Sequence, residues 1–311
     1  MSAELHPGRT KALSQGWLAA HKWLLARRLA QFGFLALFLT GPLFGLWITK
    51  GTLAASLTLN VLPLADPMMV AQAFLARHVV ETSALVGAAI VLVAYGLVGG
   101  RTYCSWVCPV NVVTDLAAWL RARFGLKEGW SLDRRTRFVV LGGVLVASAA
   151  TGTIAWEFVN PVTILHRGLV YGGLFTAGSA LLVTLALFLF DLGVASRGWC
   201  THLCPVGAFY GLLGSRSLVR VTARRRDACD NCMECFAVCP ERHVIAPALR
   251  GKSAGAGPVI TSRDCTNCGR CIDVCAKNVF EFGTRFRNGL DDVDHIVPPA
   301  KEGPGNVARA G

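Results

Sequence analysis

The chain has 311 residues, of which 53% are hydrophobic and 16% charged, and its formal net charge is +12. With a mean hydropathy of +0.48, this composition is too apolar for an ordinary soluble protein and predicts that a membrane supplies part of the solvent. Lys and Arg lie mainly beside the apolar stretches, where membrane topology accounts for them, so the positive charge does not indicate nucleic-acid binding.

Four uncharged stretches are long enough to cross a hydrocarbon core, which takes about 20 helical residues. They cover residues 29–49, 82–100, 138–156 and 168–190. Gly41-Pro42 would kink the first helix, which neighbouring membrane helices tolerate. Lys and Arg number 5 before the first stretch and then 2, 7, 1 and 16 in the successive remaining segments. The positive-inside rule therefore predicts a multi-pass protein with both termini and all cysteines on the cytoplasmic side.

An internal repeat relates the two halves of this apolar region. Cys-Ser-Trp-Val-Cys-Pro at 104–109 corresponds to Cys-Thr-His-Leu-Cys-Pro at 200–205, and Asp66-Pro67 corresponds to Asn160-Pro161. Each half thus reads as a span, an X-Pro loop, a second span and a C-x3-C-P motif. A pseudo-two-fold axis along the membrane normal would gather four thiols at the cytoplasmic surface, those of Cys104, Cys108, Cys200 and Cys204.

Helical patterns follow both motifs, at 109–124 and 205–213, with proline in the first turn. Cys108 and Cys204 are therefore expected at helix N-termini, where main-chain N–H groups and the helix dipole would lower the thiol pKa. This predicts a redox or further metal centre. The alternatives are structural thiols and a regulatory disulfide, although a lasting disulfide is disfavoured in the cytoplasm.

The C-terminal part carries two successive C-x2-C-x2-C-x3-C runs, the signature of a bacterial ferredoxin with two 4Fe-4S clusters. In such domains the fourth cysteine of each run ligates the other run's cluster. The first predicted cluster is held by Cys229, Cys232, Cys235 and Cys275, and the second by Cys265, Cys268, Cys271 and Cys239. Two zinc sites are the alternative, but this spacing suits isolated tetrahedral zinc poorly.

The predicted fold is thus an α-helical membrane domain of four transmembrane helices followed by a C-terminal α+β ferredoxin-like domain. Short β-rich stretches at 218–222, 259–262 and 279–282 flank the cysteine runs. The predicted units are a cytoplasmic N-terminal segment (1–28), the membrane domain (29–217), the ferredoxin-type domain (218–287) and a disordered tail (288–311).

Residues 17–286 resemble the NapH/MauN family of ferredoxin-type membrane proteins, and the NapH members most. Beside the cysteine motifs, the resemblance rests on Gly-Pro-Leu-Phe-Gly at 41–45, Leu-Pro-Leu-Ala-Asp-Pro at 62–67, Asn-Pro-Val at 160–162 and Gly-Trp-Cys-Thr-His-Leu-Cys-Pro-Val-Gly-Ala at 198–208. It implies a quinol dehydrogenase subunit of the bacterial inner membrane that passes electrons towards periplasmic nitrate reductase. The implied partners are the periplasmic ferredoxin-type protein NapG, the membrane-anchored multihaem cytochrome NapC, or both.

Other functions compete with this one. The MauN proteins, tied to methylamine utilisation, share the architecture, so electron transfer in that pathway is the first alternative. A redox-sensing or maturation factor is another, and a scaffold that needs its clusters only for folding is the third.

Quinol oxidation needs an apolar slot, proton acceptors and a nearby redox centre. Asp66 and His166 are the preferred candidates, because each lies in an X-Pro repeat segment and ionisable groups at a membrane often mark function. They belong to a set expected near the non-cytoplasmic ends of the spans: Asp66, His78, Glu81, Glu157, His166 and Arg167. The four C-x3-C-P thiols would then carry electrons across to the clusters. The alternative is a site near the cytoplasmic face, close to Trp106, Trp199 and His202.

Overall fold

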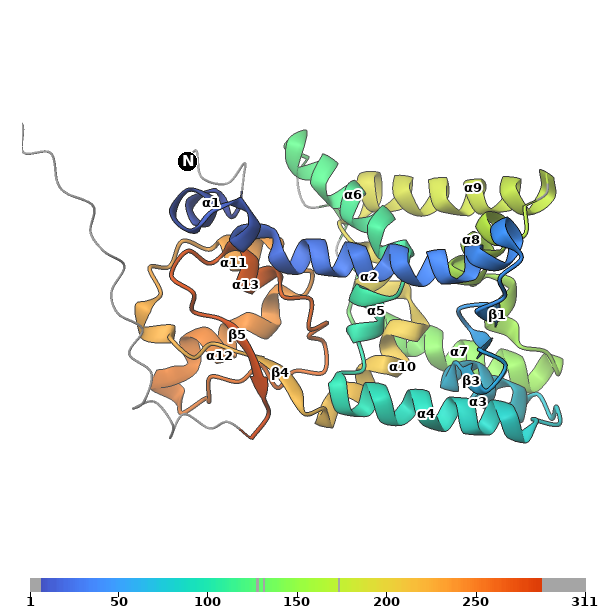
Figure 1. Ribbon diagram of the computed structural model, residues 1–311. Helices are drawn as coiled ribbons and strands as arrows, with labels where there is room; N and C mark the ends of the chain where they lie inside the picture. Colours follow the sequence, from blue (N-terminus) through green and yellow to red (C-terminus); the bar gives the residue numbers. More distant parts are fainter. Residues whose placement is uncertain (1–6, 127–128, 131, 173, 287–311) are drawn as a thin grey trace, which may run out of the picture.

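The computed structural model describes residues 7–126, 129–130, 132–172 and 174–286. Long helices run along one another at one end of the molecule, and a small α+β domain with the short helix α1 (Arg9–Gln15) beside it forms the other end (Figure 1). The predicted disordered tail at 288–311 lies outside the described residues.

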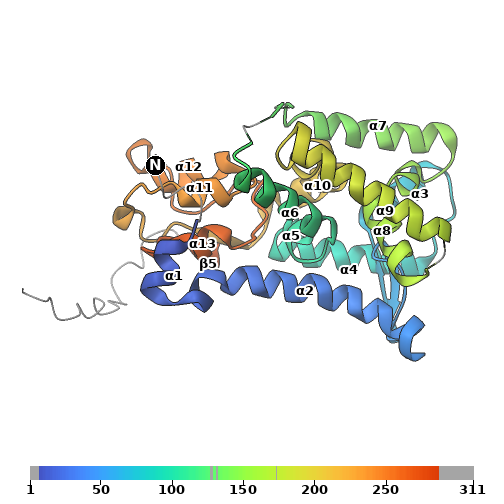
Figure 2. The same cartoon turned by 90° about the horizontal axis from the view of Figure 1, so that it is seen from above.

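Four long apolar helices build the first end, and the two views show them running along a common direction (Figures 1 and 2). They are α2 (Trp17–Phe44), α4 (Thr82–Val98), α7 (Thr136–Thr151) and α9 (Leu174–Leu189). Two helical segments, Trp17–Phe44 and Thr176–Val194, are long and apolar enough to cross a membrane, while α4 and α7 are shorter apolar helices. Many large apolar side chains on these helices face outward, as Leu29, Val139 and Leu181 do. Exposed apolar surface of this extent indicates a lipid or protein environment.

The first and last helices differ from the predicted stretches. Helix α2 continues through Pro42 and ends at Phe44, where Gly45 adopts a left-handed conformation. The chain then forms an antiparallel meander of β1 (Thr49–Gly51), β2 (Ala55–Thr58) and β3 (Leu62–Ala65). The fourth stretch, 168–190, was predicted as one span, but its first residues belong to α8 (Pro161–Val170), and Gly172 has a φ of 53°. The last long helix therefore begins only at Leu174.

Two short helices pack among the long ones where the sequence predicted X-Pro loops. Helix α3 (Pro67–Leu75) begins after Asp66, whose carboxylate accepts a hydrogen bond from the Met68 N–H at 3.0 Å. Helix α8 begins after Asn160, whose side chain accepts from the Val162 N–H at 3.1 Å. Each X-Pro pair thus forms an N-cap with proline in the first turn. Helix α3 packs against α7 and α4, and α8 packs against α2 and α9.

The contacts of the two halves correspond in pairs. Helix α2 packs against α8 and α5 (Thr102–Trp106), whereas α7 packs against α3 and the π-helical turn Trp199–Leu203. Helix α4 contacts α10 (Pro205–Leu213), and α9 contacts α6 (Val110–Arg123). The helices α6 and α10 closely follow the predicted ranges. Remaining short elements here are the π-helical turn Phe190–Val194 and the 3-10 turns Ala155–Phe158 and Gly214–Arg216.

The C-terminal domain is built on a two-stranded antiparallel sheet of β4 (Val219–Thr222) and β5 (Glu281–Thr284). Of the three predicted β-rich stretches, the first forms β4, the second contributes only a bridge between Val259 and Thr222, and the third begins at Glu281. The helices are α11 (Glu234–Val238), α12 (Ile245–Arg250) and α13 (Arg270–Val274), with 3-10 turns at Arg226–Ala228, Arg242–Val244 and Gly251–Ala254. Helix α1 (Arg9–Gln15) packs against α13 of this domain, and its Lys11 donates a hydrogen bond to the Ile272 carbonyl at 2.7 Å.

Candidate iron–sulfur centres

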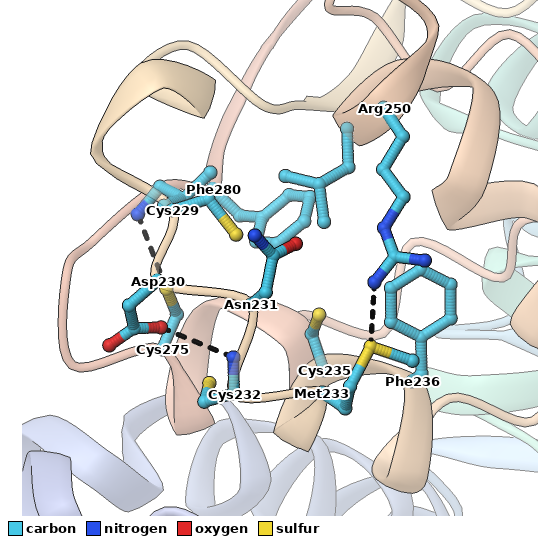
Figure 3. A pocket seen from close by; sticks show the side chains of 12 residues that line it. Cys229, Asp230, Asn231, Cys232, Met233, Cys235, Phe236, Arg250, Cys275 and Phe280 are labelled. Atoms are coloured by element: carbon cyan, nitrogen blue, oxygen red, sulfur yellow. Dashed lines mark hydrogen bonds between the residues drawn. The ribbon is translucent and has the colours of Figure 1, made fainter.

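The eight cysteines of the ferredoxin runs line two separate pockets. The outer pocket is lined by Cys229, Cys232, Cys235 and Cys275, whose positions Figure 3 shows. The inner pocket is lined by Cys239, Cys265, Cys268 and Cys271. Each pocket therefore takes three cysteines from one run and the fourth from the other. This exchange is what two-cluster ferredoxins require.

Backbone conformation explains how each run turns its sulfurs towards one pocket. Asn231 and Met233 in the first run have positive φ angles, and Asn267 and Gly269 in the second run repeat them. These left-handed residues tighten the loop just before α11 and α13 begin. A Cβ at Gly269 would meet the Trp23 ring at 2.7 Å, so this position also admits the close approach of α2.

The surroundings of the pockets suit a sulfur-ligated cluster. Beside the cysteines, apolar side chains such as Val221 and Ile260 line the inner pocket. In the outer pocket, the Val279 N–H donates a hydrogen bond to Cys275 Sγ at 3.4 Å. Burial raises the pKa of Cys239 to about 12. At Cys268 the nearby guanidinium groups of Arg270 and Arg27 outweigh burial and lower the pKa. Metal coordination would stabilise the thiolate form of the other sulfurs as well. The donor set, the apolar lining and the N–H groups thus fit a four-iron cluster in each pocket.

The inner pocket lies against the helical end of the molecule, and the outer pocket lies away from it. Ser105 Oγ donates to the Thr266 carbonyl at 2.7 Å, and Trp106 Nε1 donates to the Asn267 carbonyl at 3.0 Å. Arg270, beside Cys271, bonds both carboxylate oxygens of Asp115 in α6 at 2.6 Å. In the outer pocket, by contrast, Cys232 is exposed.

A buried ion-pair network joins the two parts of the protein. Arg101 donates to Glu241 at 2.6 Å, to the Asp264 carbonyl at 2.8 Å and to the Cys200 carbonyl at 3.2 Å. Arg137 pairs with both Glu241 and Asp264. Burial alone would raise the pKa of Asp264, but the His243 hydrogen bond and the two arginines outweigh it and hold that pKa well below its usual range.

Glu241, His243 and Asp264 also lie close enough together to hold a metal ion. Because Arg101 and Arg137 already neutralise the two carboxylates, the group is a structural ion-pair network. Sequence reasoning missed it. Both arginines border apolar stretches and were therefore attributed to membrane topology.

The four C-x3-C-P cysteines come together between α5, α6 and α10. The Cys200 thiol interacts electrostatically with the thiols of Cys104, Cys108 and Cys204. The predicted helix N-termini are present, since N–H groups of Val110 and Asn111 bond Cys108, and those of Val206 and Gly207 bond Cys204.

The predicted lowering of the thiol pKa is wrong. Burial raises the pKa of all four thiols, that of Cys204 to about 12. The N–H groups do act in the predicted direction. They are outweighed because the thiols lie in the protein interior rather than at a surface helix end.

Asp66 is half-buried at the start of α3 and contacts the helix of the second cysteine motif. Its carboxylate accepts a hydrogen bond at 3.2 Å from the hydroxyl of Tyr210, in the helix that starts directly after Cys204. Tyr210 stacks on Tyr103 at 5.2 Å, and Tyr95 packs edge-on against Tyr210 at 5.3 Å. Asp66 is thus linked through Tyr210 to the helix that follows the second C-x3-C-P motif.

His166 is fully buried on α8 with its ring edge-on to Phe38, 4.6 Å between centroids. Neither ring nitrogen has a hydrogen-bond partner among the described residues. Val162, one turn earlier on the same helix, belongs to an apolar cluster that also includes Cys108 and Trp199.

The other predicted residues are already engaged or lie at the surface. Glu157 pairs with Arg167 at 3.0 Å, and His78 and Glu81 are exposed. At the alternative site, Trp199 stacks on Trp156, and His202 bonds the Thr201 hydroxyl. Trp106 already contacts the inner-pocket loop.

Comparisons with known proteins agree with these sites. Residues 80–127 and 175–225 match a family model described as a 4Fe-4S binding domain, and residues 228–279 match a 4Fe-4S dicluster domain. The chain is 50% identical to the ferredoxin-type protein NapH of Escherichia coli K12, over 91% of this chain and 96% of that protein. The chain belongs to the NapH/MauN family of ferredoxin-type proteins. As a family member it is an iron–sulfur electron-transfer protein.

The relatives do not separate the two branches of the NapH/MauN family. The methylamine utilization ferredoxin-type protein MauN of Paracoccus denitrificans is 55% identical over 89% of this chain and 95% of that protein. NapH of Haemophilus influenzae is 47% identical over 90% of this chain and 96% of that protein. No solved structure matches the chain.

Proposed function

We propose that this NapH/MauN protein is a multi-pass subunit of the bacterial inner membrane that takes electrons from quinol and passes them through iron–sulfur centres. The helices α2, α4, α7 and α9 would be the four spans. Their outward-facing apolar side chains support this, and α4, with 17 residues, is about 25 Å long, close to the thickness of a hydrocarbon core. The Lys and Arg distribution favours a cytoplasmic C-terminal domain and cytoplasmic termini.

The observation that carries the proposal is the order of the cysteine sites. The C-x3-C-P cysteines lie beside the inner pocket, with Arg101 bonded to the Cys200 carbonyl on one side and to Glu241 and Asp264 on the other. The inner pocket adjoins the outer pocket, where Cys232 is exposed. Bound clusters would supply one-electron redox chemistry at both pockets. This chain's own residues hold neighbouring sites next to one another and shield the inner pocket from water.

The two pockets would hold the clusters by the crossed cysteine sets that line them. We further propose that Cys104, Cys108, Cys200 and Cys204 hold a third iron–sulfur or metal centre. The family match to a 4Fe-4S binding domain spans both motifs, and main-chain N–H groups directed at Cys108 and Cys204 would stabilise coordinated thiolates. The corresponding packing of α2 with α8 and of α7 with α3 supports the two-fold repeat that this site needs.

Electron delivery towards periplasmic nitrate reductase, with NapG or NapC as partner, is the pathway we propose from the likeness to NapH. A MauN-type role in methylamine utilisation is the second candidate, because identity to the P. denitrificans MauN is 55%, against 50% to the E. coli NapH. Expressing this chain in E. coli lacking NapH and in P. denitrificans lacking MauN separates them. We expect restored nitrate-dependent electron flow in the first strain, and restored growth on methylamine only in the second would reverse the assignment.

The electron-transfer proposal is tested on protein purified without oxygen. About eight irons per chain fit two clusters, and about twelve would place a third cluster at the C-x3-C-P cysteines. Quinol should produce the EPR signals of reduced clusters. Cys204→Ser should weaken that reduction by quinol, while reduction by dithionite persists. A redox sensor or maturation factor instead predicts a nitrate reductase that lacks its cofactor when this protein is absent.

A further inference from the structure

Two buried polar residues occupy corresponding places in the halves of the helical region. Gln72 lies six residues after Asp66 in α3, and His166 lies six residues after Asn160 in α8. Both side chains are fully buried. Corresponding positions in a repeated unit share backbone surroundings, so any difference in hydrogen bonding reflects the side chains around them.

Gln72 has a partner for its carbonyl oxygen and for its amide group. Its Oε1 accepts from Ser148 Oγ at 3.1 Å and from the Trp156 N–H at 3.0 Å, and its Nε2 donates to the Met68 carbonyl at 3.3 Å. Ser148 belongs to α7, eleven residues after the buried Arg137. In this half of the helical region, the buried polar side chain is hydrogen-bonded within the protein and has a structural role.

His166 meets an apolar partner instead. The residue eleven positions after the buried Arg27 of α2 is Phe38, whose ring lies edge-on against the imidazole. Within the described part of the chain, both imidazole nitrogens lack a partner. A buried polar group without a partner is costly and often marks a functional site, and His166 is the member of the pair left open.

The position of His166 suits a ligand that arrives from the lipid. Leu169, one turn after His166 on α8, and Leu37, beside Phe38 on α2, are exposed apolar residues. In the other direction along α8, Val162 packs in the cluster that contains Cys108. Along α8, His166 thus lies one turn from the exposed Leu169 on one side and about one turn from Val162, which packs with Cys108, on the other.

We propose that His166 binds the head group of a lipid-soluble quinol, which displaces the Phe38 ring. This inference rests on the proposed function and selects one of its two candidate residues. Asp66, the other candidate, is already bonded to Tyr210 and to the Met68 N–H.

The chemistry of a neutral imidazole fits both forms of this ligand. A quinol hydroxyl donates to the unprotonated ring nitrogen, and the carbonyl of the quinone product accepts from the ring N–H. Oxidation of the quinol to quinone releases two electrons, which bound iron–sulfur clusters would accept one at a time. The quinol also loses two protons, which pass in turn to the imidazole and from it to water, so that a neutral quinone leaves.

The test uses full-length protein in detergent, with decylubiquinol and menadiol as separate probes. His166→Leu should raise the apparent KM for quinol-driven cluster reduction by about three- to tenfold, since the hydrogen bond to the quinol is lost. The melting temperature of His166→Leu should equal or exceed that of the parent, because the substitution removes an unpartnered buried polar group. Reduction of this variant by dithionite should give the same EPR signals as in the parent. The matched control, Gln72→Leu, should lower the melting temperature and leave the KM unchanged.

His166→Gln is the second variant, and it keeps a polar group at nearly the same size. Loss of clusters or of folding in both His166 variants would overturn the proposal, because the residue would then be structural. An unchanged KM in His166→Leu, or a raised KM in Asp66→Asn alone, would also overturn it. If parent protein is reduced by dithionite but never by quinol, the proposed function itself fails.

Discussion

Replacing Arg101 should loosen the contact between the helical region and the C-terminal domain. The side chain is 2% exposed, and so is that of its partner Glu241. Removing one member of a buried ion pair usually costs about 3 to 5 kcal/mol, because the remaining charge stays buried. Arg137 also pairs with Glu241, at 3.2 Å, so for Arg101→Gln we expect the low end, about 3 kcal/mol.

A double-mutant cycle with Glu241→Gln measures this coupling. Thermal unfolding of the anaerobic protein in detergent, followed by cluster absorbance, gives the stability of each variant. Because the double variant leaves no unpaired carboxylate, its loss should be smaller than the sum of the two single losses by about 1 kcal/mol or more. Strictly additive losses would refute the pairing of these two side chains.

Three further outcomes follow from local contacts. Gly269→Ala should lower the melting temperature, because the added Cβ would lie 2.7 Å from the Trp23 ring and the backbone φ is +72°. The control Gly33→Ala should not lower it, because its Cβ would meet no atom within 4 Å. Equal effects of the two substitutions would contradict this prediction. Tyr210→Phe should cost about 1 kcal/mol in thermal unfolding through loss of the bond to Asp66, and no change would show that the bond is unimportant. Burial alone would raise the pKa of Asp115, but nearby arginines, Arg270 above all, outweigh it and lower this pKa from 3.8 to about 2. That pKa shift stabilises the folded state by about 2 kcal/mol above pH 4, and this stabilisation is lost as the pH falls towards 2. The stability of Asp115→Asn should therefore fall less steeply with acid than that of the parent protein.

The sequence predicted best what depends on local spacing. The C-x2-C-x2-C-x3-C runs fix tight loops, and the structure lines two pockets with the crossed cysteine sets. Helices α6 and α10 follow proline in the C-x3-C-P motifs, close to their predicted ranges. Apolar stretches located four long helices for the same reason, since helix length and hydropathy are properties of a short window.

Hydropathy could not separate α8 from α9, because residues 168–190 are apolar throughout and only the turn at 171–172 divides them. The interior place of α3 and α8 depends on packing between the halves. The same holds for Arg101 and Glu241, which pair across 140 positions. The sign of the thiol pKa shift was missed because sequence shows a helix N-terminus but not its burial.

The most direct test of the account is an anaerobic EPR titration of the purified protein with quinol, followed by dithionite. The account predicts that quinol alone reduces iron–sulfur centres in the parent, and that Cys204→Ser loses most of this signal while dithionite still reveals both clusters of the C-terminal domain. Clusters that dithionite reduces fully, but that quinol leaves oxidised in the parent, would contradict it.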